Sequence, residues 1–155
     1  MPSSEKPCRS TQFVRIGVVA DPVNAAAIRR EFADWLGRYF SLDATKISDV
    51  VLAVNEAMAN AAEYAYATAA QPGAMHVHAD YDRSGSTLTV IVADEGAWRA
   101  CDPATKEHKR GRGIPLMHAL ADRVTVDSSP AGTRVCLEWA DVPATESTVC
   151  DGLRA

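Results

Sequence analysis

Four polar residues recur along one predicted helix in a pattern that suits metal binding. Separated by steps of 7, 4 and 3 residues, they are Asp49, Glu56, Asn60 and Glu63. At about 100° per residue, these steps bring the four side chains to one side of an α-helix. Residues 47–82 contain no Lys or Arg, so the acids have no basic partners there. Uncompensated acids beside an amide suit a hard cation such as Mg²⁺, although a solvent-facing acidic stripe is the commoner use of this pattern.

A second candidate site lies at the end of a predicted strand. Residues 86–93 run into the sequence Asp94-Glu95-Gly96. A carboxylate at a strand end can accept a hydrogen bond from a ligand, and a following glycine lets the ligand approach the backbone closely. The same sequence is also typical of an ordinary turn, and taken alone it favours that turn.

A third candidate site precedes a short predicted helix at 113–121, where the chain reads Lys109-Arg110-Gly111-Arg112-Gly113. Glycines let backbone N–H groups point outward, and a helix N-terminus adds positive potential, so this motif can hold a phosphate chain. Five basic residues stand against two acids between residues 99 and 112, in a chain that is acidic overall. This local excess of positive charge favours an anionic ligand over a plain glycine-containing loop.

A fourth candidate is Gly132-Thr133, at the start of the last predicted strand. The Thr133 hydroxyl can face a pocket there. Threonine is common in strands, however, and most strand threonines are structural.

The elements that must position these residues follow from hydrophobic periodicity, caps and turn residues. Asp21-Pro22 and Asp43 are typical helix starts. Val14, Ile16 and Val18 alternate on one face of the first predicted strand. Strands are predicted at 12–19, 74–82, 86–93, 123–128 and 133–139, and helices from Asp21-Pro22, over 44–69 and over 113–121.

The order β-α-α-β-β-α-β-β, with hairpins between neighbouring strands, predicts an α+β fold. We expect a two-layer sandwich in which helices pack on one face of a mostly antiparallel mixed sheet. The domain is expected to span residues 12–139, between a flexible leader at 1–11 and a flexible tail at 140–155.

Composition narrows the classes of function. The chain has 155 residues and a net charge of −4, which disfavours a general nucleic-acid binder because such proteins need a basic surface. No apolar run approaches the roughly 20 residues that span a membrane. The N-terminus has no signal-peptide core, and the four cysteines form no CxxC pair, so we expect a cytoplasmic protein with free thiols.

The four candidate sites occur in an order that resembles the nucleotide-binding boxes of the gyrase, chaperone and histidine-kinase-like ATPase superfamily (the Bergerat fold). These boxes are Glu56-x-x-x-Asn60, Asp94-x-Gly96, Gly111-x-Gly113 and Gly132-Thr133. The likeness covers about residues 12–139. Two segments are most similar to bacterial anti-sigma-factor serine kinases. They are Asn-Glu-Ala-Met-Ala-Asn-Ala-Ala-Glu-Tyr around Glu56 and Arg-Gly-Arg-Gly-Ile-Pro-Leu-Met from Arg110.

The resemblance implies ATP and Mg²⁺ as cofactors. Asn60 would coordinate Mg²⁺, and Glu56 would be the general base for the attacking hydroxyl. Asp94 would accept a hydrogen bond from the adenine amino group, Gly96 would leave room for the ring, and Thr133 would support the adenine end.

The phosphate end of the site would come from the third box. The resemblance implies that Gly111 and Gly113 shape the loop over the phosphates. From their position beside these glycines, Lys109, Arg110 and Arg112 are expected to neutralise charge on the γ-phosphate.

The resemblance also implies partners. A kinase of this type binds a sigma factor and phosphorylates a small anti-sigma factor antagonist, thereby controlling transcription in the stress response, and it forms homodimers. Two alternatives are a non-catalytic ATP-binding module and a detached histidine-kinase catalytic domain. Trp98 and Tyr64 depart from the residues that the family often has at these positions.

Overall fold

The computed structural model describes residues 12–65, 71, 73–96 and 113–145. The expected leader at 1–11, the end of the helix predicted at 44–69, the basic segment at 97–112 and residues 146–155 lie outside the described residues. The elements are β1 (Gln12–Val19), α1 (Pro22–Tyr39), α2 (Ala44–Asn60), the π-helical turn η2 (Ala61–Ala65), β2 (Ala74–Asp82), β3 (Thr87–Asp94), α4 (Gly113–Leu120), β4 (Arg123–Ser129) and β5 (Gly132–Trp139).

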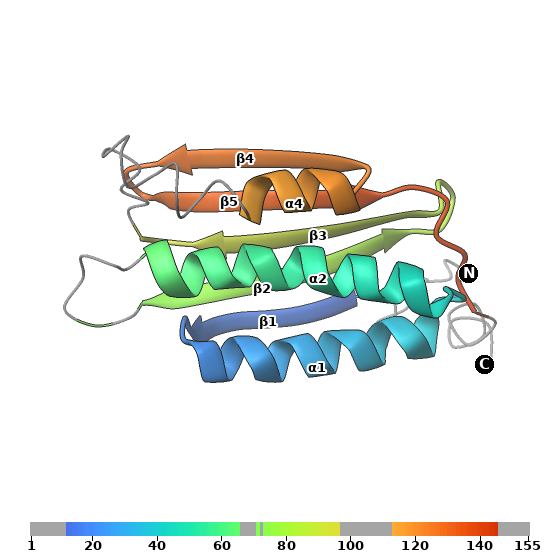
Figure 1. The fold of residues 1–155 in the computed structure, drawn as a ribbon, viewed down its shortest axis with the longest axis horizontal. Helices are drawn as coiled ribbons and strands as arrows, with labels where there is room; N and C mark the ends of the chain where they lie inside the picture. The colour runs from blue at the N-terminus through green and yellow to red at the C-terminus, as the bar shows by residue number, and fades with distance from the viewer. Residues whose placement is uncertain (1–11, 66–70, 72, 97–112, 146–155) are drawn as a thin grey trace, which may run out of the picture.

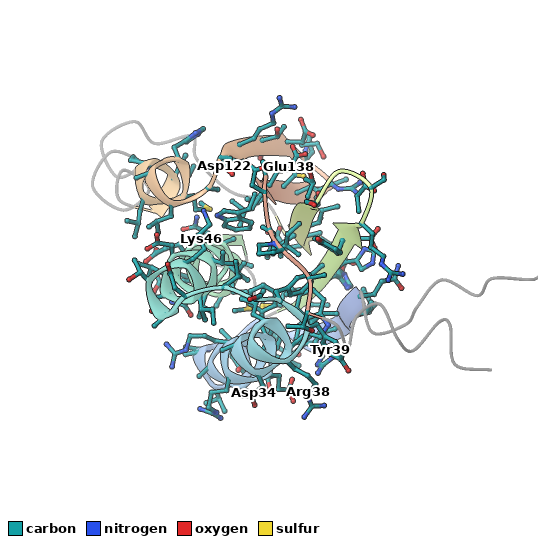
Figure 2. All side chains as sticks on the ribbon, turned by 90° about the vertical axis from the view of Figure 1, so that its right-hand side faces the viewer. Asp34, Arg38, Tyr39, Lys46, Asp122 and Glu138 are labelled. Carbon is teal, nitrogen blue, oxygen red and sulfur yellow. The ribbon has the colours of Figure 1, made fainter. Side chains whose placement is uncertain are left out.

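The five strands form one sheet in the order β1-β2-β3-β5-β4, and every neighbouring pair is antiparallel. Helices α1, α2 and α4 lie together on one face of that sheet (Figure 1). A view turned by 90° shows the helix layer on one side and the sheet on the other, with side chains between them (Figure 2). The expected two-layer α+β sandwich is confirmed, and its described strands are antiparallel throughout.

The core lies between the two layers. Along β3, Leu88, Val90 and Val92 are buried against the helices, as their alternation predicts. Phe32 of α1 and Val54 of α2 meet them from the helix side, and both are fully buried. None of the helices in the described segments combines the length and apolarity needed to cross a membrane.

Both helix starts predicted from aspartates are confirmed. Asp21 Oδ1 accepts the Asn24 backbone N–H at 2.7 Å, and Asp43 Oδ1 accepts the Lys46 backbone N–H at 2.7 Å. Each aspartate thereby satisfies one of the N–H groups that a helix start leaves without a partner, a contribution of about 1 kcal/mol each. These caps fix where α1 and α2 begin.

The first strand departs from the alternation expected of it. Val14 is 43% exposed and Ile16 is 63% exposed, whereas Val18 packs against the core. The expectation that these three share one face is wrong because the register shifts between Arg15 and Val18. Gly17 has a φ of +71° there, a left-handed conformation that glycine adopts without steric cost. This β-bulge reverses which side chains face the helices.

The folded part of the chain extends beyond Trp139, the end that the sequence led us to expect. Val142 is fully buried, and its carbonyl oxygen accepts the Tyr81 hydroxyl at 2.6 Å. The Ser41 N–H donates to the Pro143 carbonyl at 2.8 Å, and the Thr145 N–H donates to the Tyr39 carbonyl at 2.9 Å. Residues 140–145 therefore pack across the connection between α1 and α2 and are not a frayed tail.

Candidate functional site

Three elements that carry predicted site residues converge at one end of the molecule. The C-terminal ends of α2 and β3 and the start of β5 all lie at the left in Figure 1. Strand β3 is hydrogen-bonded to β5, and η2, which continues α2, contacts β3. The fold therefore brings residues from positions 56, 94 and 133 to a common end of the helix–sheet sandwich.

Glu56 and Asn60 occupy the last turn of α2, four residues apart and so on one side of the helix. Asn60 is only 3% exposed, and its Nδ2 atom is buried with no hydrogen-bond partner among the described residues. Glu56 is half-buried. Because an unpaired buried amide typically costs about 1–3 kcal/mol, Asn60 is a poor choice for stability alone. Its side chain is better explained by a ligand that completes its bonding.

The π-helical turn explains why the polar stripe does not continue beyond Asn60. Glu63 is exposed and lines a groove of about 150 Å³ against α1, next to Asn55 and Ala59. A π-turn advances each residue through a smaller angle than an α-helix does, so it rotates Glu63 towards the side that carries Asn55. The expectation that Glu63 shares a side with Asn60 and Glu56 is therefore wrong, whereas Asp49, seven residues before Glu56 in α2, stays on their side.

Asp94 ends β3 on the side of the sheet that faces the helices. It stands opposite Thr133 of β5 and is only 6% exposed, while Thr133 is 2% exposed. Asp94 Oδ1 accepts the Gly96 backbone N–H at 3.0 Å, which closes a tight turn. Asp94, Gly96 and Thr133, predicted separately from the sequence, therefore belong to one cluster.

A cavity of about 350 Å³ opens beside this cluster. Asp94 and Thr133 line it together with Ala93, Asp127, Ser128, Ser129, Ala131, Gly132 and Arg134. Glu56 and Asn60 do not line this cavity. Ala93, Arg134 and Asp127 pair across neighbouring strands on the sheet face away from the helices, so this cavity opens on that face and not between the two layers. The described site therefore has two parts, the buried strand end at Asp94 and Thr133 and the helix-end pair on α2, and η2, which continues α2, contacts β3.

The third predicted box is described only at its edge. Gly113 begins α4, as expected from a glycine at a helix start. Lys109, Arg110, Gly111 and Arg112 lie outside the described residues, so their predicted contacts with phosphate remain predictions. Helix α4 packs beside α2, which places the end of this box next to the helix that carries Glu56 and Asn60.

Sequence reasoning missed one polar partner in the cluster. Ser128 Oγ lies 3.1 Å from Thr133 Oγ1, within hydrogen-bonding distance. The turn residues Pro130-Ala131 could have predicted this contact, because a hairpin closed there pairs Ser129 with Gly132 and Ser128 with Thr133.

His76 of β2 makes a further polar contact, next to the Asp94–Gly96 turn. Its side chain is 24% exposed, and its Nε2 lies 2.7 Å from Glu95 Oε1. No local sequence signal identifies this contact, because it depends on how β1, β2 and β3 are aligned.

The residues fit a Mg²⁺ ion that is held mainly by its nucleotide. Mg²⁺ prefers oxygen ligands and keeps several waters, so proteins usually hold it through one or two side chains plus phosphate oxygens. The described residues contain no group of three or more His, Cys, Asp or Glu that could cage a metal. Asn60 can meet this smaller requirement through its amide oxygen Oδ1, and its unpartnered Nδ2 can donate to a phosphate oxygen.

Comparisons with known proteins agree with this geometry. The family model of the histidine kinase-like ATPase domain matches residues 18–139. The crystal structure of the RsbU and RsbW domains of Rv1364c from Mycobacterium tuberculosis matches with a TM-score of 0.65 and 23% identity. That match covers 83% of this chain but only 32% of the crystallised Rv1364c chain, so this chain spans about a third of the length of that structure.

A second solved structure has the same fold. One chain in the crystal structure of the SiaB-SiaC complex from Pseudomonas aeruginosa matches with a TM-score of 0.60 and 13% identity. The match covers 84% of this chain and 90% of the other. At these identities, both likenesses establish a shared fold.

Proposed function

This chain belongs to the histidine kinase-like ATPase domain family, and we propose that it is an ATP-dependent protein serine/threonine kinase that acts as an anti-sigma factor. The observation that carries this proposal is the buried Asn60 side chain, whose Nδ2 has no partner among the described residues and which lies one turn beyond Glu56. Its Nδ2 can donate to a phosphate oxygen while its Oδ1 binds a metal. A helix end with one metal-binding amide and one carboxylate suits phosphoryl transfer. That reaction depends mainly on positioning and on stabilising charge.

The end of β3 around Asp94, on the face that the helices cover, is the proposed adenine site. The Asp94 carboxylate would accept a hydrogen bond from the adenine amino group, and the turn to Gly96 leaves room beside it. Thr133 would support the adenine end beside Asp94, and its contact with Ser128 orients the Thr133 hydroxyl. Burial of Asp94 and Thr133 strengthens these bonds, since water competes less for them.

The helix end is the proposed centre of phosphoryl transfer. Asn60 would hold Mg²⁺, which neutralises charge on the phosphates when bound. Glu56 would accept the proton of the seryl or threonyl hydroxyl of the antagonist. The oxygen of that hydroxyl would bond to the γ-phosphorus as ADP leaves. Lys109, Arg110, Gly111, Arg112 and Gly113 are the proposed phosphate-binding segment.

The proposed partners are a sigma factor and an anti-sigma factor antagonist, with the antagonist as the phosphorylated protein. One of the similar structures contains an RsbW domain and the other is a complex of two proteins, SiaB and SiaC, and both support a regulatory protein that works by binding others. We also propose that the protein acts in the cytoplasm and that it forms a homodimer.

Phosphoryl transfer to candidate antagonists tests this function. The protein is incubated with Mg²⁺, γ-labelled ATP and each antagonist, and label is expected on the antagonist and not on this chain. Glu56→Gln is the matched variant: it should bind ATP but transfer roughly 10²–10⁴-fold more slowly, the usual worth of a general base. Nucleotide binding with no transfer to any antagonist would instead identify a non-catalytic ATP-binding module.

A further inference from the structure

The β-bulge in β1 leaves one backbone N–H group outside the ladder of the sheet. Arg15 pairs with Val77 and Val18 pairs with Met75, so two residues of β1 stand opposite the single residue His76 of β2. The second of the two, Gly17, donates its N–H to His76 Nδ1 at 2.9 Å. The imidazole thus takes the place of the backbone carbonyl that the bulge has displaced.

This bond determines what the other side of the ring does. Because Nδ1 accepts a hydrogen bond, its lone pair is in use and the ring proton must lie on Nε2. Nε2 then donates to Glu95 Oε1 at 2.7 Å. The ring therefore connects the bulge of the edge strand to the residue that follows Asp94.

Side chains alternate between the two faces of the sheet along β3, and this alternation connects the His76–Glu95 contact to Asp94. Asp94 stands opposite Met75, on the face buried by the helices, whereas His76 stands opposite Ala93 on the other face. Glu95 follows Asp94, and its carboxylate reaches His76 on that second face. The Asp94–Gly96 turn is thus held from both faces of the sheet, by the bond from Gly96 N–H to Asp94 and by the bond from His76 to Glu95.

We infer that His76 is a positioning residue that fixes the Asp94–Gly96 turn through Glu95, and so sets how Asp94 is presented to its ligand. The role in ligand binding rests on the proposed nucleotide site, whereas the effect on the turn does not. His76 touches no atom of the ligand in this scheme and acts only through the backbone that carries Asp94.

Hydrogen exchange at the Gly96 amide reports directly on the turn, with or without nucleotide. In His76→Asn, the side-chain oxygen can still accept the Gly17 N–H, but the side chain is too short to reach Glu95. In His76→Gln, the side-chain nitrogen can still donate to Glu95. We expect His76→Asn to raise Gly96 exchange by about two- to tenfold, the effect of losing one hydrogen bond, and His76→Gln to stay near the parent rate.

Two further variants act as controls. His78→Asn makes the same substitution two residues along the same face of β2, opposite Ile91, and should leave Gly96 exchange unchanged. Glu95→Ala should raise exchange as His76→Asn does, and the double variant should be no worse than either single one. Glu95 is 64% exposed at its side chain, so this variant is expected to fold.

Calorimetric titration with Mg·ATP separates the effect of His76 on the turn from its role in ligand binding. We expect His76→Asn to bind Mg·ATP about two- to tenfold more weakly and His76→Gln to bind it normally. Unchanged Gly96 exchange in His76→Asn, or equal effects of the Asn and Gln variants, would overturn the role of His76. A parent protein that binds no nucleotide would reject the proposed function and with it the ligand-binding role, even where the exchange result holds.

Discussion

Gly132 lies directly against the backbone of Asp94, without space for any side chain between them. A Cβ atom on residue 132 would overlap the Asp94 carbonyl oxygen and stand 2.9 Å from the Glu95 Cα. Gly132 also has a φ of +149°, which L-residues rarely adopt. The start of β5 therefore approaches the end of β3 so closely that only glycine fits at position 132.

Replacing Gly132 by alanine should push β5 away from Asp94. We expect Gly132→Ala to lower the free energy of unfolding by about 1–3 kcal/mol, the usual cost of overpacking. Urea denaturation measures this change. Gly37→Ala is the matched control: a Cβ there meets nothing within 4 Å, and in the exposed helix it should stabilise by about 0.5–1 kcal/mol. Equal stability of Gly132→Ala and the parent would show that the strands separate at no cost.

The charge of Asp94 should contribute more to the affinity for ATP than the shape of its side chain does. Asp94→Asn keeps an oxygen that can accept the Gly96 N–H and the adenine amino group, but it loses the charge that strengthens such bonds. We expect roughly tenfold weaker Mg·ATP binding by calorimetry, which corresponds to about 1.4 kcal/mol. Asp127→Asn removes a charge from the same end of the sheet but from the face away from the helices, because Asp127 pairs with Arg134, and it should bind normally. If both variants bind equally well, Asp94 does not hold adenine.

The Asn60 side chain is expected to add no stability to the free protein but to be required for Mg·ATP binding. Its unpartnered amide is costly to bury, so Asn60→Ala is expected to unfold at a urea concentration no lower than that of the parent. The same variant should lose the extra stability that Mg·ATP gives the parent, since a ligand stabilises only a fold that it binds. Asn55→Ala, on another side of α2, should keep that extra stability. A destabilised Asn60→Ala that still responds to Mg·ATP would contradict the metal role.

Cys136 should react slowly with alkylating reagents. Partial burial raises the pKa of its thiol above the ordinary value of 9.0, and the nearby Glu138 carboxylate adds to this. Since the thiolate is the reactive form, iodoacetamide should modify Cys136 more slowly than a free cysteine peptide at pH 8. Tandem mass spectrometry resolves the site, and urea should abolish the difference.

The same raised pKa links Cys136 to stability. The folded protein holds the thiol proton more tightly than the unfolded chain does, so this contribution is fully present below pH 9.0. It is lost as the pH rises through the higher pKa of the folded state. Cys136→Ser should remove that alkaline dependence.

Local signals predicted much of the fold. Asp21 and Asp43 cap α1 and α2 because a cap depends only on residues within the first turn. The two hairpins follow from alternating residues on either side of short turns. The pairing of Asp94 with Thr133 joined two predicted sites that the sequence separates by almost 40 residues.

Non-local geometry accounts for what the sequence did not predict. The bulge at Gly17 appears only when β1 is aligned with β2, and it exposes Val14 and Ile16. The π-turn after Asn60 moves Glu63 away from the stripe that an ideal α-helix would continue. Residues 140–145 have no alternation or helical period that predicts their place, yet Val142 is buried because its carbonyl accepts the Tyr81 hydroxyl and its N–H donates to the Ser86 carbonyl.

The position of β5 has a consequence for synthesis of the chain. Within this domain, strand β5 is the last strand to be made, yet it lies between β3 and β4, and residues 140–145 then close over Tyr39 and Ser41. Until β5 emerges from the ribosome, the edge of β3 has no partner strand and the core side of Leu88 and Val90 is incompletely covered. The nascent chain is therefore expected to need protection from aggregation until almost all of the domain has been translated.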